Sequence, residues 1–479
     1  MNDKTVSAII VGISIVVAGG LLWWLLGSPT EIEPIKRVTD VEAETLAGTM
    51  DDGSASKESI VNIEGIFEEF ENSPTEPSSS WTTFRGSDYS NVVTDGPALA
   101  ESWPAEGPPV KWMVELGEGH SGAGVFNGKV YILDYDEEEE GDSLRCFSLS
   151  DGKELWRRWY KAPTKKNHGV SRTVPAITEK YTVTIGPRCH VMCVDTETGN
   201  FRWGIDMVAE YGTEVPLWYT GQCPIIDNGV AILAPVGSNL MMGVDCETGK
   251  VLWETPNELG WNMSHSSIMP MTLLGKKTYV YCAIGGIFGV SAEPEDVGKL
   301  LWSSNVWTHS VTSPSPLAID DSRIFLTAGY GSGSMMLGLK EEGGEIKVEP
   351  LFELDKKVFG CEQQTPVFYE GHIFGILPKD AAALRGQFVC MNPDGEIVWS
   401  SGKMERFGLG PFMFADDKVF ILDDNGELTL IKASLDKYEQ LARHKVLPGH
   451  DAWAPMALVD GFLLLRDNKR MACLDVRAK

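Results

Sequence analysis

The sequence predicts an all-β protein, an eight-bladed β-propeller with four antiparallel strands in each blade. Two observations indicate this class. The 50 glycines and 26 prolines are spread along the 479 residues, which is typical of many short strands joined by turns. A unit that ends in a tryptophan-bearing strand also recurs at a regular interval, which is the signature of a repeat architecture.

The repeat consists of a turn, a β-rich run, an aspartate–glycine turn and a strand that carries tryptophan. Its clearest copies are DTETGNFRW (Asp195–Trp203) and DCETGKVLW (Asp245–Trp253). Successive aromatic positions lie about 44 to 50 residues apart, the length that four short strands need. We expect each ring to fill the space between neighbouring blades. These blade aromatics are Trp112, Trp156, Trp203, Trp253, Trp302, Phe352 and Trp399, and a degenerate eighth copy falls near His444.

The two ends of the repeat region complement each other. Val110–Leu116 is a tryptophan strand with no earlier strands of its own, and residues 454–475 supply three strands that lack a tryptophan strand. Joining them makes one composite blade and hides sheet edges that would otherwise be exposed. We therefore expect residues 108–479 to form the closed propeller, with its last blade completed by the N-terminal strand.

Residues 81–107 form a pre-propeller segment. Its W-x-x-F-R-G motif (Trp81–Gly86) and the D-x-x-T-G-x-x-x-W motif of the repeats resemble the pyrroloquinoline-quinone-like (PQQ-like) repeat family. The resemblance covers about residues 81–479 and implies the propeller fold, with the pre-propeller segment lying against it. A shared fold does not decide activity, so the function has to be argued from the site.

The resemblance implies two classes of function. Quinoprotein dehydrogenases hold pyrroloquinoline quinone and calcium over the propeller centre, whereas members similar to the outer-membrane-assembly lipoprotein are not enzymes and present loops to protein partners. This sequence lacks the adjacent cysteine pair of the alcohol dehydrogenases, and no set of calcium ligands can be placed in it. We therefore predict a protein-interaction or ligand-binding scaffold without enzyme activity. The alternative is a quinoprotein oxidoreductase that binds the quinone and calcium at the central funnel.

The N-terminal region predicts a membrane anchor. Residues 6–26 carry no charge and are long enough to span a bilayer as a helix, with Trp23 and Trp24 near one end. We expect residues 1–27 to be an uncleaved transmembrane signal-anchor, in contrast to the lipid anchor of the assembly lipoprotein. The propeller would then face the periplasm or another extracytoplasmic space.

Residues 28–80 have the acidic, aromatic-poor composition of a flexible linker. One stretch differs, because apolar residues recur there at helical spacing and predict a short helix over residues 59–71. This helix would dock on the propeller or bind a partner. Its apolar positions are Ile60, Ile63, Phe67 and Phe70.

The formal charge of −27 argues against nucleic acid as a partner, because phosphate binding needs an opposing field. We expect a monomer that binds an envelope protein or a small ligand. The nine cysteines include no CxxC and no adjacent pair, so we expect buried apolar thiols, and a disulfide or two stays open as the alternative.

Histidine is scarce, yet five of the eight histidines precede strands that should line the central channel, and aromatic or amide residues take this place in two other blades. We predict a ligand site at this mouth, for an anion, a quinone-like cofactor or a transition metal. The alternative is a hydrogen-bonded polar lining, and no catalytic residue is predicted. The candidates are His120, His168, Trp218, Tyr219, His265, His309, Gln363 and His450.

Overall fold

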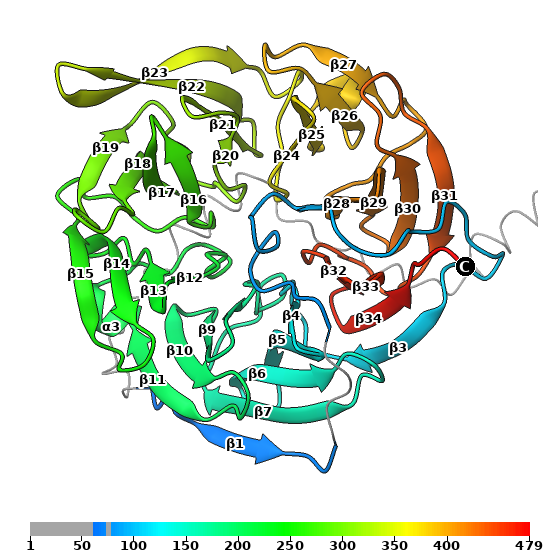
Figure 1. The fold of residues 1–479 in the computed structure, drawn as a ribbon, viewed down its shortest axis with the longest axis horizontal. Coiled ribbons are helices and arrows are strands. Elements are labelled where there is room, and N and C mark those ends of the chain that lie inside the picture. The colour runs from blue at the N-terminus through cyan, green and yellow to red at the C-terminus, as the bar shows by residue number, and fades with distance from the viewer. Residues whose placement is uncertain (1–60, 73–77) are drawn as a thin grey trace, which may run out of the picture. The chain divides into compact units, whose positions relative to one another are not determined.

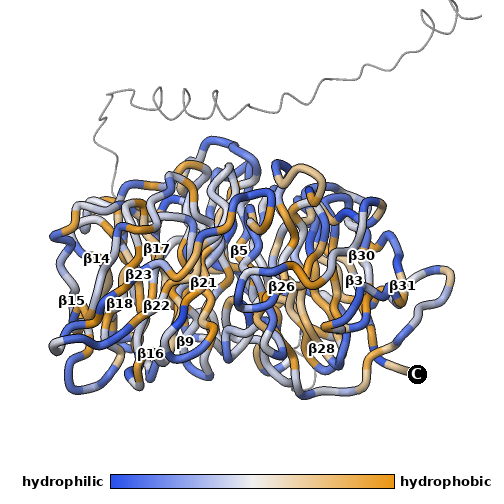
Figure 2. The backbone as a smooth tube through the Cα atoms, turned by 90° about the horizontal axis from the view of Figure 1, so that it is seen from above, coloured by the Kyte–Doolittle hydropathy of each residue, from blue (hydrophilic) through white to orange (hydrophobic). Residues whose placement is uncertain are grey.

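The computed structural model describes residues 61–72 and 78–479, which form eight sheets arranged in a ring around a central axis (Figure 1). Each sheet contains a blade of four antiparallel strands, and two of the sheets carry one additional strand. Apolar residues run through the middle of the ring, and polar residues gather toward its two faces (Figure 2). The predicted all-β, eight-bladed propeller is therefore confirmed.

The strands of blades 1 to 4 follow one another along the chain. Blade 1 comprises β4 (Gly124–Phe126), β5 (Lys129–Asp136), β6 (Gly141–Ser148) and β7 (Glu154–Lys161). Blade 2 comprises β8 (Ala176–Ile177), β9 (Tyr181–Ile185), β10 (His190–Asp195) and β11 (Phe201–Asp206), followed by the helix α3 (Met207–Tyr211). Blade 3 comprises β12 (Ile225–Asp227), β13 (Val230–Leu233), β14 (Asn239–Asp245) and β15 (Val251–Pro256). Blade 4 comprises β16 (Met269–Leu273), β17 (Lys276–Ala283), β18 (Gly286–Ser291) and β19 (Leu300–Ser304).

Blades 5 to 8 continue the ring. Blade 5 comprises β20 (Leu317–Ala318), β21 (Arg323–Ala328), β22 (Gly333–Glu342) and β23 (Glu345–Leu354). Blade 6 comprises β24 (Val367–Tyr369), β25 (His372–Ile376), β26 (Phe388–Met391) and β27 (Ile397–Ser400), with the 3-10 turn η1 (Ala382–Leu384) before β26. Blade 7 comprises β28 (Phe412–Ala415), β29 (Lys418–Leu422), β30 (Glu427–Lys432) and β31 (Gln440–Lys445). Blade 8 comprises β32 (Ala457–Val459), β33 (Phe462–Arg466), β34 (Arg470–Asp475) and the early strand β3 (Val110–Glu115).

The composite blade closes the ring as the sequence predicts, since β3 pairs with β34. The fully buried side chain of Arg466 then joins blade 8 to blade 1. Its Nη2 donates to the carbonyl oxygen of Gly117 at 2.8 Å, and the guanidinium lies 3.7 Å from the carboxylate of Asp134. Strands from the two ends of the propeller sequence therefore meet in one hydrogen-bonded sheet.

In several repeats the blade aromatic packs against the glycine turn of the next blade. The indole Nε1 of Trp112 donates to the carbonyl oxygen of Leu149 at 2.7 Å, and that of Trp203 donates to Cys246 at 2.9 Å. The turn needs glycine for two reasons. Gly152 has a φ of 69°, and a Cβ at this position would lie 2.7 Å from the ring of Trp112. The turn glycine and the preceding blade's tryptophan thus form one contact between blades.

The helix predicted over residues 59–71 is wrong in the part of this range that the structure describes. Ile66–Glu69 instead form the strand β1, which pairs antiparallel with the outer strand β7. An unpaired sheet edge offers backbone hydrogen bonds, and an isolated helix of this length is marginal in water. Ile63 and Phe67 still face the propeller, so the apolar spacing identified the buried side but not the conformation.

The predicted anchor, residues 1–27, lies outside the described residues, as does most of the predicted linker. Among residues 61–72 and 78–479 there is no helix of the length and apolar character that crossing a membrane requires.

The pre-propeller segment lies across one end of the central axis (Figure 1, blue). Trp81 exchanges backbone hydrogen bonds with Val125 of blade 1, and Thr82 accepts one from Ile177 of blade 2. The strand β2 (Val92–Val93) runs parallel to β28 of blade 7. Residues far apart around the ring are therefore joined by this segment.

Arg85 fixes the segment inside the ring. Its side chain is buried, and its three nitrogens donate to the backbone oxygens of Tyr89, Ser90, Thr365 and Pro366 at 2.9 to 3.0 Å. Burial lowers the pKa of this guanidinium to about 9. The arginine of the W-x-x-F-R-G motif is therefore a structural residue that connects the segment to blade 6.

A buried carboxyl group lies between blades 1 and 2. Asp142 is 2% exposed, and it accepts a hydrogen bond of 2.5 Å from the hydroxyl of Tyr160, whose ring contacts His190. Burial raises the pKa of Asp142 to about 7, and the nearby charge of Asp134 adds to the shift. No basic side chain contributes to this shift, so ionisation of Asp142 disfavours the fold.

We expect Asp142→Asn to stabilise the propeller in a pH-dependent way. The folded pKa of Asp142 lies above the unfolded value of about 4, so its contribution to stability is present at pH 4 and is lost as the pH rises toward 7. Asparagine keeps the acceptor for Tyr160 and carries no charge. Denaturant unfolding should show a gain of roughly 2 to 4 kcal/mol at pH 8 and almost none at pH 4. Exposed Asp321→Asn is the control, and an equal gain at both pH values would contradict the prediction.

Candidate functional site

The second end of the axis is lined by the loops that precede the inner strands. The inner strands run in the same direction around the ring, and the pre-propeller segment contacts their last residues, such as Ile177 and Ala415. The loops that contain His120, Arg172 and His265 come before these strands. They therefore lie at the opposite end, which we call the axial mouth.

A belt of hydrogen bonds fixes these loops relative to one another. The backbone N–H of Val174 donates to the sulfur of Cys223, and that of Cys223 donates to Oγ of Ser267. The N–H of Ser267 donates to Oγ of Ser315, and that of Ser315 donates to Oγ1 of Thr365. Each residue occupies the same position in successive blades 2 to 6. Small polar side chains at this repeat position thus align five blades at the axis.

Arg172 is the central charge of the axial mouth. Its Nη2 donates to the backbone oxygens of Asn167, His168 and Gly169 at 2.9 to 3.2 Å, and its buried Nε has no hydrogen-bond partner. Among the described residues this guanidinium forms no ion pair. Burial lowers its pKa to about 10, so the group is still cationic at neutral pH. A half-buried cation without a carboxylate is a natural site for an anion.

Two of the predicted histidines lie close to this cation and are held neutral. His120 is 7% exposed, with Nε2 2.8 Å from the backbone oxygen of His168 and with a buried Nδ1 that has no hydrogen-bond partner. Burial and the charge of Arg172 keep its pKa well below the usual value. The same two causes lower the pKa of His265 to about 4. At neutral pH both imidazoles are therefore uncharged donors and acceptors.

Aromatic faces form one side of the mouth. The ring of Trp218 is stacked near His265 at 6.1 Å and near Tyr330 at 5.8 Å between centroids. Nδ1 of His265 lies 3.0 Å from the backbone oxygen of Tyr219, and the hydroxyl of Tyr219 donates to the backbone oxygen of Lys165. These loops also hold residues in left-handed backbone conformations, which commonly mark functional sites. They are His168, Trp218, Tyr219, Tyr330 and Asp451.

The structure does not bring all the predicted residues together. The imidazole of His168 is exposed, and only its backbone oxygen contacts His120. His309 packs on Trp307 at 4.3 Å between ring centroids, and burial lowers its pKa. His450 is exposed and lies 3.1 Å from Asp451. Gln363 is half-buried and forms none of the contacts described here.

Sequence reasoning missed Arg172, Tyr330 and Trp453. Arg172 lies four residues after His168 in the same loop, so a search of that loop for cations could have found it. Trp453 lies beside His120, with ring centroids 4.9 Å apart, and it follows His450 in the sequence. Tyr330 belongs to the turn between β21 and β22, so the pattern of residues before inner strands does not include it.

The side chains fit only part of a quinone–calcium site. A cation and a stacked indole suit a planar anion, but in the described part of the chain no three His, Cys, Asp or Glu side chains gather as metal ligands. All nine cysteines are buried free thiols, and burial raises the pKa of Cys223 to about 11. The donor set of the axial mouth therefore does not fit calcium.

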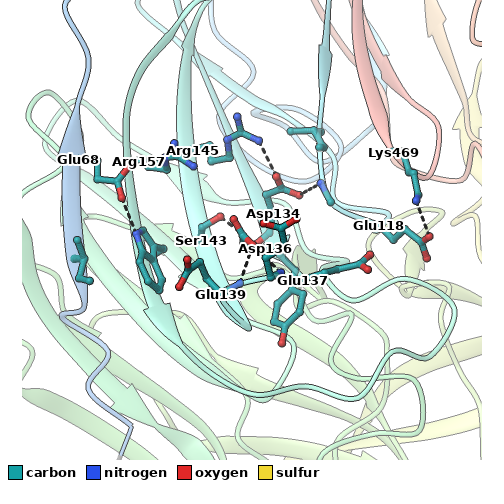
Figure 3. A pocket seen from close by; sticks show the side chains of 16 residues that line it. Glu68, Glu118, Asp134, Asp136, Glu137, Glu139, Ser143, Arg145, Arg157 and Lys469 are labelled. Atoms are coloured by element: carbon teal, nitrogen blue, oxygen red, sulfur yellow. Dashed lines mark hydrogen bonds and ion pairs between the residues drawn. The ribbon is translucent and has the colours of Figure 1, made fainter.

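A second hollow of about 760 Å³ lies on blade 1, between β1 and the acidic turn that begins at Asp136 (Figure 3). Its cations are all paired. Arg145 binds Asp134 and Glu154, Arg157 lies 3.0 Å from Glu68, and Lys469 lies 3.1 Å from Glu118. Asp136 accepts backbone hydrogen bonds within its own turn. This groove thus differs from the axial mouth, where Arg172 has no acidic partner among the residues that the structure describes.

A family model described as outer membrane protein assembly factor BamB matches residues 140–345. The structure resembles that of BamB from Moraxella catarrhalis, with 13% identity and a TM-score of 0.50, over 77% of this chain and 99% of that one. No curated protein sequence matches the chain.

Two quinohemoprotein alcohol dehydrogenases also share the fold. The enzyme from Comamonas testosteroni is 10% identical with a TM-score of 0.58, and ADHIIG from Pseudomonas putida HK5 is 12% identical with a TM-score of 0.55. Each match covers 84% of this chain and 81% of the other. At such identities the likeness establishes the fold alone, so the function has to be argued from the side chains.

We expect Arg172→Gln to raise the pKa of His265, because the nearby positive charge disfavours the imidazolium. The rise should be roughly half a unit to one unit, since burial of the imidazole remains. Titration of the histidine ring signals by NMR measures it. Lys379→Gln, which removes a cation over the ring of Tyr330, is the matched control. No shift, or an equal shift in both variants, would show that Arg172 does not face His265.

Proposed function

Because the chain is an eight-bladed propeller of the PQQ-like repeat family, we propose that it works by binding, as a membrane-tethered scaffold in the cell envelope. The binding site is the axial mouth, and the group it takes is an anion of a partner protein or a small ligand. The single observation that carries this proposal is the cation of Arg172, which has no carboxylate partner among residues 61–72 and 78–479.

The surroundings of Arg172 favour binding over acid–base chemistry. A general base has to change protonation near the working pH, and a pKa of about 4 keeps His265 neutral there. Neutral imidazoles and an unused guanidinium N–H can instead hydrogen-bond a carboxylate or phosphate oxygen. Trp218 and Tyr330 add aromatic surface for the remainder of the bound molecule.

The protein as a whole repels anions, so the axial mouth has to attract them locally. The net charge is −27, but Arg172 and Lys379 lie near this end of the axis. A positive group recessed between low-dielectric walls can attract an anion despite the overall charge. An acidic segment of an envelope protein and a small carboxylate both fit this chemistry.

The proposed membrane tether of the propeller rests on the N-terminal sequence. The uncharged residues 6–26 support a helical membrane anchor, and the acidic linker would let the propeller reach away from the bilayer. We propose that the body faces an extracytoplasmic space and acts as a monomer.

The second candidate function is a quinoprotein oxidoreductase. The stacked indole of Trp218 near the cation favours it, because pyrroloquinoline quinone is a planar anion. In the described part of the chain no three His, Cys, Asp or Glu side chains gather as metal ligands, and this favours the binding scaffold. Calcium dependence of quinone binding separates the two candidates.

Calorimetry on the detergent-solubilised full chain tests the proposal. We expect an acetylated tetraglutamate peptide to bind in a salt-dependent way and its tetraglutamine counterpart not to bind. Arg172→Gln should weaken peptide binding by about tenfold, the usual effect of losing one charge-assisted contact. Lys379→Gln, which removes another cation at the same mouth, should weaken peptide binding less than Arg172→Gln does.

Titration with pyrroloquinoline quinone tests the second candidate function. Saturable binding of pyrroloquinoline quinone only with calcium, lost in Arg172→Gln, would favour the oxidoreductase. Absence of binding by both the peptide and the quinone would remove the axial mouth as an anion site.

A further inference from the structure

Blade 1 carries a strand that the ring does not need. It already has four strands of its own, and β1 adds a fifth at the rim. In the described part of the chain the other seven blades carry no added strand at the rim. The closing contacts between blades 8 and 1 involve β3, β34 and Arg466, and none of them uses β1. The added strand is therefore a docked segment and not part of the closure.

The docked segment contacts β7 through one aromatic ring and one carboxylate. Phe67 packs on Trp156 at 6.0 Å between ring centroids, and the guanidinium of Arg158 lies 5.1 Å from the same phenyl ring. The carboxylate of Glu68 accepts a hydrogen bond from Nε1 of Trp159 at 3.1 Å and lies 3.0 Å from Nε of Arg157. An aromatic ring followed by a carboxylate is thus the pattern that this edge recognises, and Figure 3 shows the carboxylate, Glu68, beside Arg157.

The receiving strand differs from the other tryptophan strands. Its sequence ELWRRWYK contains a second tryptophan, Trp159, and the adjacent cations Arg157 and Arg158. A basic, aromatic edge in a chain of net charge −27 complements an acidic and aromatic strand. Backbone pairing adds affinity that does not depend on sequence, as in other cases of strand addition.

The docked segment also builds one wall of the blade 1 groove. Ile66 and Glu68 line this groove, and Ile66 is 51% exposed there. Ile63, in contrast, is 7% exposed and packs in the cluster around Tyr160. Release of the segment would therefore uncover both the edge of β7 and the apolar surface beneath Ile63.

We propose that the outer edge of β7 is a strand-accepting surface for an extended segment of a partner protein that carries an aromatic residue followed by a carboxylate. The chain's own residues 61–72 occupy this surface in cis and so compete with the partner. The surface is separate from the axial mouth, and the proposal does not depend on the function assigned to that mouth.

One full-length variant opens the edge, and a second full-length variant is its control. Phe67→Asp removes the ring that packs on Trp156, whereas Ile66→Asp alters a neighbouring exposed apolar residue of the same strand and is the matched control. The probe is a fluorescent peptide of residues 61–72, followed by fluorescence anisotropy. We expect the Phe67→Asp chain to bind the peptide at least tenfold more tightly than the wild-type chain and the Ile66→Asp chain.

A charge exchange tests the recognition itself. In the Phe67→Asp chain, Arg157→Glu should weaken peptide binding by about tenfold, and a peptide with Glu68→Arg should restore it. Arg172→Gln should leave peptide binding unchanged, which separates this surface from the axial mouth. If the Phe67→Asp chain does not fold, full-length Glu68→Arg provides a second opened edge for the same titration.

Two results would overturn the proposal. One is a folded Phe67→Asp chain that binds the peptide no more tightly than the Ile66→Asp chain does, which would mean that the segment docks only because it is covalently attached. The other is a wild-type dimer in sedimentation that Phe67→Asp dissolves, because the occupant would then be a second copy of this chain.

Discussion

The contact on which the packing of the blades depends is the aromatic residue of one blade packed against a loop of the next, most often a glycine turn. A sheet of four short strands cannot bury both of its faces alone, so each blade needs a neighbour on each side. Trp112 and Trp203 show how the contact is made, with an indole N–H on a turn carbonyl and a glycine that leaves room for the ring. Repetition of this contact has to end in closure, which β3 provides.

Closure fixes the positions of loops that are hundreds of residues apart. The belt from Val174 to Thr365 holds five blades in register at the axis, and Arg85 ties the pre-propeller segment to the same region. One end of the axis is therefore covered by the chain itself. The other end keeps a set of polar and aromatic side chains whose spacing the ring determines.

Three arginines near the axis differ in how completely the protein satisfies their guanidinium groups. Arg85 donates from all three of its nitrogens to backbone oxygens, and Arg466 lies near the carboxylate of Asp134. Arg172 and Arg466 each have a buried Nε without a hydrogen bond, but among the described residues Arg172 has no ion pair. Because a half-buried cation without a described acidic partner is unfavourable, Arg172 is, of these three arginines, the one whose position a structural role explains least.

The sequence by itself determined the class of fold, the number of blades, the composite last blade and the aromatic residues between blades. These features depend on local periodicity and on turn chemistry, which neighbouring residues in the chain specify. It also identified the loops at the axial mouth, since every inner strand is preceded by an equivalent loop. The tertiary structure alone decided that residues 66–69 form a strand, because the unpaired edge of β7 overrides the helical spacing of the segment. It likewise decided that Arg172 lies near His265 and that Trp218 stacks near both His265 and Tyr330, because such neighbours depend on how each loop turns at the axis and not on its distance along the chain.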